Sequence, residues 1–79
     1  MQLHELAKGQ VAKIISVKGD DPILEAKLRE IGFAEDDIVE MIEHGPLGKT
    51  PLCIRLNQTL VALRLAETKG VVVEPMSDE

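Results

Sequence analysis

The side chains that could bind a metal ion are few and widely spaced. Only His4, His44 and Cys53 offer nitrogen or sulfur ligands, and no two of them have the i, i+3 or i, i+4 spacing that places ligands together on a helix. A site of two histidines and one carboxylate would need both histidines to converge. We therefore expect no tight iron site and no cofactor. An opportunistic divalent site stays open as the alternative to surface histidines and solvated acids, with these neighbouring carboxylates: Asp36, Asp37, Glu40 and Glu43.

A second chemical candidate is the Gly48-Lys49-Thr50 tripeptide, which has the end of a phosphate-binding loop. The glycine that should begin such a loop, five residues earlier, is replaced by Glu43. Pro51 also prevents the helix that must follow the loop, because proline has no N–H and clashes with the preceding turn. The tripeptide therefore predicts a turn with an exposed lysine and no nucleotide site.

The single cysteine, Cys53, lacks the surroundings of a nucleophile. It alternates with apolar neighbours in a strand pattern, so we expect it to be partly exposed beside Arg55. A reactive thiolate needs a base or a stabilising charge, and the sequence fixes no histidine close to it. No set of serine, histidine and acid is evident either. We therefore predict that the protein is not an enzyme.

Length and composition limit the remaining classes. The 79 residues predict one domain, and its core must be aliphatic because Phe33 is the only aromatic residue. A formal net charge of −5 and the lack of stacking aromatics argue against nucleic-acid binding. The sequence has neither a signal-peptide run nor an apolar stretch long enough to span a bilayer. We expect a cytoplasmic protein without direct membrane insertion.

One helix is predicted over residues 22–31. Asp20 and Asp21 can cap its start, Pro22 suits its first turn, and Gly32 supplies its end. Glu25 and Arg29 are spaced to form an ion pair on its surface. Such a short helix must be held by packing on a sheet. The apolar face expected to make that contact consists of Leu24, Leu28 and Ile31.

Five short strands are predicted around this helix, over residues 10–18, 38–43, 52–57, 60–64 and 71–74. The adjacent Ile14 and Ile15 break the alternation of the first strand, which indicates either a bulge or burial on both faces. Turns are expected at Asp36-Asp37 and at Asn57-Gln58. A helical turn is expected over residues 65–69. The opening Leu3, Leu6 and Ala7 should lie under the sheet. This order predicts a mostly β chain with one short helix, arranged as a small five-stranded barrel.

The order of motifs resembles the FeoA family of bacterial ferrous iron uptake. Leu3-x-x-Leu6-x-x-Gly9 is followed by L-R-E-I-G-F, G-P-L-G-K-T-P, L-V-A-L-R-L-A-E and V-V-V. The resemblance implies an SH3-like barrel over residues 1–75, with residues 76–79 as a frayed tail. It also implies an accessory protein that binds and modulates the FeoB transporter at its cytosolic GTPase region, where the nucleotide chemistry belongs. The family's usual glycine near residue 36 is replaced by Asp36-Asp37.

Six residues are candidates for contact with a partner. The loop of Pro46, Leu47, Gly48 and Lys49 presents an apolar tip, and such loops often carry function on a rigid scaffold. The alternative is that Leu47 folds back to plug one end of the barrel. Arg29 and Arg64 match positive positions of the family patterns L-R-E-x-G and A-L-R. Their alternative is a structural role, in which the stem covers apolar surface and the guanidinium pairs with carboxylates.

Three other functions compete with this interpretation. The domain could serve as a metal-responsive regulatory unit like those of iron-dependent repressors, although the chain has no helix-turn-helix segment. It could also be a generic protein-interaction module, including a weak homo-oligomer. A polyproline-binding SH3 domain needs an aromatic-lined groove, which one phenylalanine cannot supply.

Overall fold

The computed structural model describes residues 1–18, 21–45 and 51–76, and in this part of the chain one α-helix accompanies five strands. The prediction of a mostly β fold with one short helix is confirmed. Two short 3-10 helices complete it. In chain order the elements are η1 (Leu3–Glu5), β1 (Val11–Val17), α1 (Pro22–Ile31), β2 (Ile38–Glu43), β3 (Leu52–Leu56), β4 (Thr59–Leu63), η2 (Leu65–Thr68) and β5 (Val71–Pro75).

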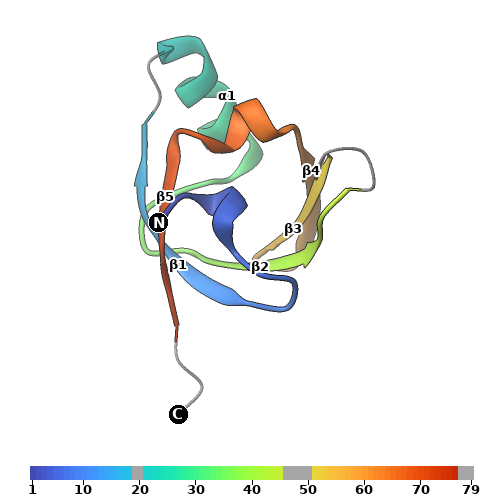
Figure 1. Ribbon diagram of the computed structural model, residues 1–79. Coiled ribbons are helices and arrows are strands. Elements are labelled where there is room, and N and C mark those ends of the chain that lie inside the picture. Colours follow the sequence, from blue (N-terminus) through green and yellow to red (C-terminus); the bar gives the residue numbers. More distant parts are fainter. Residues whose placement is uncertain (19–20, 46–50, 77–79) are drawn as a thin grey trace.

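The strands form one antiparallel sheet in the order β4-β3-β2-β1-β5. The sheet curves around the interior, with α1 at one end and η1 inside the curve (Figure 1). It does not close, because β4 and β5 are its two edges and no pairing joins them in the described residues. The expected barrel is therefore a curved open sheet.

Aliphatic side chains from every strand fill the interior, together with Phe33 and two leucines of the opening segment. Phe33 is only 1% exposed and is the largest of the fully buried side chains. The alternation predicted for β3 is confirmed, since Leu52, Ile54 and Leu56 are buried while Arg55 is exposed. Among the residues that the structure describes, the buried core consists of Leu3, Leu6, Ala12, Ile14, Val17, Leu28, Phe33, Val39, Met41, Leu52, Ile54, Leu56, Leu63, Val71 and Val73.

Helix α1 begins and ends as predicted. The backbone N–H of Ile23 donates to the Asp21 carboxylate at 2.9 Å, so Asp21 is the N-cap, whereas Asp20 lies outside the described residues. At the other end Gly32 has a φ of +128°. The Phe33 N–H then donates to the Leu28 carbonyl at 3.0 Å, which is the Schellman arrangement. Phe33 and Leu28 are both buried members of the core.

Two residues expected in the core are exposed, and those expectations were wrong. Ile31 is 38% exposed, because the helix buries the side of Leu28 and Leu24 and leaves Ile31 at its rim. Ala7 is exposed because residues 7–10 turn away from the core, with the Gln10 N–H donating to the Ala7 carbonyl at 2.9 Å. Leu3 and Leu6 are buried as expected.

The Ile14-Ile15 pair marks a β-bulge. The pairing of β1 with β5 shifts register between Ile14 and Ser16, so Ile15 has no cross-strand partner there. Ile14 is buried while Ile15 is 45% exposed. Of the two interpretations that the sequence allowed, the bulge is correct and burial on both faces is wrong.

Both predicted tight turns use a non-glycine residue in the left-handed region. Asn57 has a φ of +58° in the hairpin between β3 and β4, and Asp36 has a φ of +76° before β2. Asn and Asp tolerate this region better than most residues, because their short polar side chains hydrogen-bond locally. The backbone N–H of Asp36 donates to the Ile14 carbonyl at 2.8 Å, which fixes the turn on β1.

The strain at Asp36 gives a stability prediction. Asp36→Val should lower the free energy of unfolding by about 1–2 kcal/mol, because a β-branched residue is disfavoured at positive φ. Asp36→Gly should change it by less than about 1 kcal/mol, since relief of strain opposes the added chain entropy. Urea titrations measure both effects, with Asp37→Val as the neighbouring control outside the left-handed region. Equal stability of the Val and Gly variants would contradict the backbone argument.

Candidate functional site

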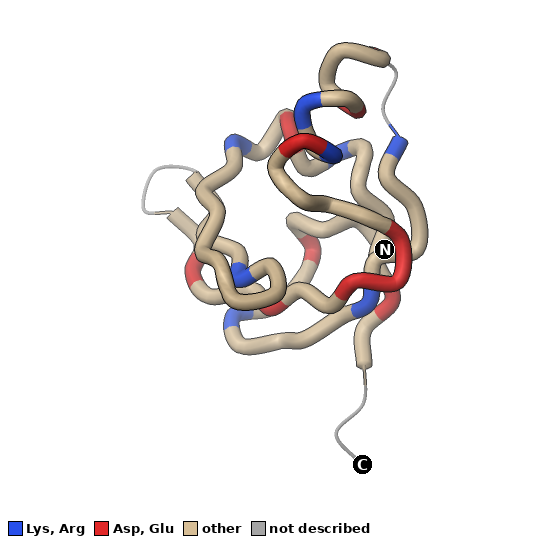
Figure 2. The backbone as a smooth tube through the Cα atoms, turned by 180° about the vertical axis from the view of Figure 1, so that it is seen from behind, with Lys and Arg blue, Asp and Glu red and all other residues tan. Residues whose placement is uncertain are grey.

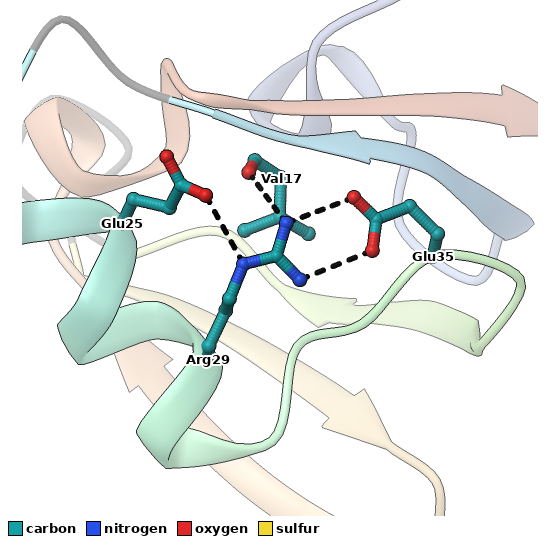
Figure 3. A network of polar contacts seen from close by, with 4 residues as sticks. All are labelled: Val17, Glu25, Arg29 and Glu35. Carbon is teal, nitrogen blue, oxygen red and sulfur yellow. Dashed lines mark hydrogen bonds and ion pairs between the residues drawn. The ribbon is translucent and has the colours of Figure 1, made fainter. Parts of the chain in front are cut away.

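Arg29 lies at the centre of a polar network that joins three segments of the chain (Figure 3). Its Nε donates to Glu25 at 3.1 Å, and its two terminal nitrogens donate to the Glu35 carboxylate at 3.1 and 2.9 Å. One of these nitrogens also donates to the Val17 carbonyl at 3.1 Å. The guanidinium therefore ties α1 to the end of β1 and to the turn before β2. These contacts support the structural role of Arg29, while recognition of a partner by Arg29 stays a prediction.

The network shifts the pKa values of both partners. Hydrogen bonds from Arg29 are the main cause that lowers the pKa of Glu35 from 4.5 to about 2, and Glu35 raises the pKa of Arg29 above its usual range. A carboxyl whose pKa is lowered by folding stabilises the folded state fully at pH values above its pKa in the unfolded chain. This contribution is lost as the pH falls through its pKa in the folded protein. The contribution should therefore decline between about pH 4.5 and 2.

This window can be tested with Glu35→Gln. The wild-type protein should have a higher urea midpoint than the variant at pH 6, and the difference should shrink steadily as the pH falls from 4.5 toward 2. Residual pH dependence in the variant is expected, because the pKa of Glu67 is lowered as well. A constant difference in urea midpoint between the two proteins over this pH range would show that Arg29 does not lower the pKa of Glu35.

A groove lies between α1, β4 and η2, with a volume of about 410 Å³. Ile31, Ala62 and Leu63 supply its apolar walls, and Lys27, Arg64 and Glu67 supply its charges. We call it the α1–β4 groove. Its residues come from segments far apart in sequence, and the remaining lining residue is Pro51.

Two of the charged side chains hold the groove together. Lys27 Nζ donates to the Glu67 carboxylate at 2.9 Å, which links α1 to η2. The other oxygen of Glu67 accepts the backbone N–H of Arg64 at 2.8 Å. The hydrogen bond from the Arg64 backbone, followed by the one from Lys27, lowers the pKa of Glu67. Glu67 therefore remains ionised and fixes the junction of β4 and η2.

Arg64 contributes a positive charge that has no hydrogen-bonded partner among the described residues. Its side chain is exposed, and its guanidinium makes no hydrogen bond or ion pair with the residues that the structure describes. An apolar wall beside a free guanidinium can hold an apolar side chain and pair with a neighbouring carboxylate. Figure 2 shows acidic and basic residues interspersed around the chain, so this local cation is set in an otherwise mixed surface.

Two of the candidate metal ligands, His4 and Glu40, make contacts with other side chains. The hydroxyl of the buried Thr68 donates to the Leu65 carbonyl at 2.7 Å and lies 3.3 Å from His4 Nδ1, so it can accept a hydrogen bond from that nitrogen. Glu40 pairs with Arg55 at 3.2 Å on the outer face of the sheet. Cys53 is half-buried, and its thiol is free rather than part of a disulfide. Over residues 1–18, 21–45 and 51–76 no three His, Cys, Asp or Glu side chains gather as a metal site would require.

The loop candidates Pro46, Leu47, Gly48 and Lys49 lie outside the described residues, so their contact with a partner stays a prediction. In the described part of the chain, α1 and the two 3-10 turns are too short or too polar to cross a membrane.

Of the two candidate contact residues that the structure describes, Arg64 lines the α1–β4 groove and Arg29 does not. Sequence reasoning missed Lys27 and Glu67, which are 40 positions apart, and it assigned Ile31 to the core. The signal for Glu67 was its position three residues after Arg64, the spacing of a carboxylate that reaches back to a backbone N–H at a helix start.

Comparison with known proteins agrees with the fold. The family model described as the FeoA domain matches residues 1–75. The crystal structure of Stenotrophomonas maltophilia FeoA complexed with zinc, described as a prokaryotic SH3 domain protein and a proposed ferrous iron transport activating factor, has a TM-score of 0.82. It is 37% identical over 94% of this chain and 89% of its own.

Two further solved structures extend the comparison. The solution structure of Chlorobium tepidum FeoA has 25% identity and a TM-score of 0.87, with 100% of this chain and 73% of that chain covered. A FeoA-like protein from Clostridium acetobutylicum shares the fold at 22% identity and a TM-score of 0.87, over 100% and 90% of the two chains. No curated protein sequence matches this chain.

Proposed function

Because this chain belongs to the FeoA domain family, which is associated with ferrous iron transport, we propose that it is a non-enzymatic cytosolic accessory protein that binds and modulates the FeoB transporter. The family match carries this proposal. The family is described by transport and an SH3-like fold rather than by catalysis, which supports a role through binding. We also propose residues 1–75 as the functional domain, in keeping with the end of β5 at Pro75.

The partner in this proposal is the cytosolic GTPase region of FeoB, and the docking surface is the α1–β4 groove. The groove combines an apolar wall with a guanidinium that has no partner among the described residues. Buried apolar anchors and arginines supply most of the binding energy at protein interfaces. The segment of FeoB that enters the groove should therefore present an apolar side chain with a carboxylate beside it.

Arg64→Glu should weaken binding to the FeoB GTPase region by more than about 1 kcal/mol, roughly fivefold or more. The reason is that the new carboxylate at position 64 would lie against the carboxylate expected on the FeoB segment. The melting temperature should stay nearly unchanged, since the Arg64 side chain is exposed. Calorimetric titrations with and without guanine nucleotide measure the affinity. Lys18→Glu, the same charge change at an exposed site beyond β1, should bind like the wild type.

The possible outcomes distinguish failure of the proposed function from failure of the proposed docking surface. Failure of the wild-type protein to bind the FeoB region in every nucleotide state would overturn the proposed function. Normal binding by Arg64→Glu would leave the function standing and exclude the groove. Leu47→Asp then tests the loop: loss of binding without loss of stability would make Leu47 the anchor, whereas a lower melting temperature would mean that Leu47 is buried.

A further inference from the structure

The two edges of the sheet differ in how they are protected. The outer edge of β5 is covered by the opening residues, since Gln2 forms a β-bridge with Val72 and the Val73 N–H donates to the Met1 carbonyl at 2.7 Å. β5 also ends at Pro75, and proline cannot donate to a further strand. Both features are ways in which proteins prevent unwanted pairing at a sheet edge.

The outer edge of β4 has no such cover in the described residues. The hairpin pairs Leu56 with Thr59 across two turn residues, and the pair that flanks such a turn exchanges both backbone hydrogen bonds. Val61 and Leu63 then also bond to β3, because bonded pairs alternate along an antiparallel ladder. The N–H and C=O groups of Leu60 and Ala62 therefore point away from the sheet. Neither residue takes part in any other hydrogen bond that the described chain makes.

The sequence of β4 adds no obstacle to pairing. Thr59–Leu63 contains no charged residue and no proline, which are common means of blocking an edge. Leu60 is 58% exposed, the largest exposed fraction among the large apolar side chains of the described strands. The edge ends at Arg64, because both of its backbone groups are bonded to Glu67. The Arg64 N–H donates to the Glu67 carboxylate, and the Arg64 C=O accepts the Glu67 N–H. The open edge is thus short and centred on Val61.

We propose that β4 pairs antiparallel with β4 of a second copy of this chain, around a two-fold axis at Val61. In this register Leu60 of each copy lies opposite Ala62 of the other. Each of these pairs exchanges two backbone hydrogen bonds, about four in total. Val61 lies opposite its own copy on the inner face, where β-branched residues pack well across strands. The two sheets become one continuous ten-stranded sheet.

A second copy fits this edge for two reasons. The pairing is self-complementary, as an isologous two-fold interface requires. At the ends of the register Arg64 lies opposite the neutral Gln58, so no like charges are set against each other. The contact is also small, well below the roughly 800 Å² per partner of a stable dimer, so the association is weak and depends on concentration.

The test is the association of the 79-residue protein between about 0.05 and 2 mM, a range suited to weak self-association. Sedimentation equilibrium should show the mean mass rising toward that of a dimer. Over the same range, amide proton exchange at Leu60 and Ala62 should slow. A protein that stays monomeric to about 2 mM, or that dimerises without slower exchange at these two amides, would overturn the proposal.

Ala62→Pro is the decisive variant, because it removes an outward N–H without touching the bonds between β4 and β3. It should weaken association at least about tenfold. Leu60→Lys places a charge on the edge and should weaken association without unfolding, since Leu60 is exposed. Val72→Lys on the opposite edge strand is the matched control and should dimerise normally. Wild-type association in both β4 variants, or its loss only in the control, would exclude the β4 pairing.

Discussion

Phe33→Ala is expected to leave much of the protein unfolded at 25 °C. The ring is 1% exposed and is the only aromatic group in the core, and removal of a buried phenylalanine typically costs about 3–5 kcal/mol. A core in a chain of this size rarely supplies more than about 3–5 kcal/mol in total. The loss should therefore match the whole stability of the domain. Circular dichroism during urea and thermal unfolding measures it.

The control for this prediction is Ile23→Ala on α1. Ile23 is 77% exposed, so its truncation should change the free energy of unfolding by less than about 0.5 kcal/mol. For a domain of this length each kcal/mol corresponds to about 4–8 °C in melting temperature, so the two variants should be far apart. A Phe33→Ala protein that melts close to the wild type would remove Phe33 from the core.

Leu28→Ala should lower the free energy of unfolding by about 2–4 kcal/mol, because Leu28 is fully buried where α1 packs on the sheet. Ile31→Ala on the same helix should cost less than about 1 kcal/mol, because Ile31 is largely at the surface of the α1–β4 groove. The pair removes similar apolar groups from one helix and differs mainly in burial. Equal losses in urea titrations would mean that Ile31 is part of the core.

The elements that the sequence predicted well are those with local signals. The cap at Asp21 and the stop at Gly32 gave the bounds of α1, because both act within a few residues of the helix ends. The alternation in β3 gave its buried face, since the side chains of a strand alternate whatever lies beyond it. The Ile14-Ile15 pair indicated either a bulge or burial on both faces for the same reason, and the structure has the bulge. The Glu25–Arg29 pair, four positions apart on the helix, is likewise confirmed.

The site could not be predicted in this way, because it depends on how separate elements meet. The helical period places Ile31 near the face of Leu28, but the contact of α1 with the core is made by Leu28 and Leu24, and Ile31 is left at the rim. The ion pair of Lys27 with Glu67 joins residues 40 positions apart, and neither spacing nor propensity connects them. Closure of the sheet could not be predicted from local patterns either, since it depends on whether the two edge strands, β4 and β5, pair with each other.

The pairing of β1 has a consequence for how the chain folds during synthesis. β1 lies between β2 and β5, so one of its partners is the last strand of the chain. The hairpin of β3 and β4 can form as soon as it leaves the ribosome, but β1 keeps an unpaired edge until residues 71–75 have emerged. Such long-range contacts slow folding. The edge of β1 that faces β5 therefore stays unpaired until synthesis of the domain is nearly finished, and this is the stage at which a chaperone would be needed.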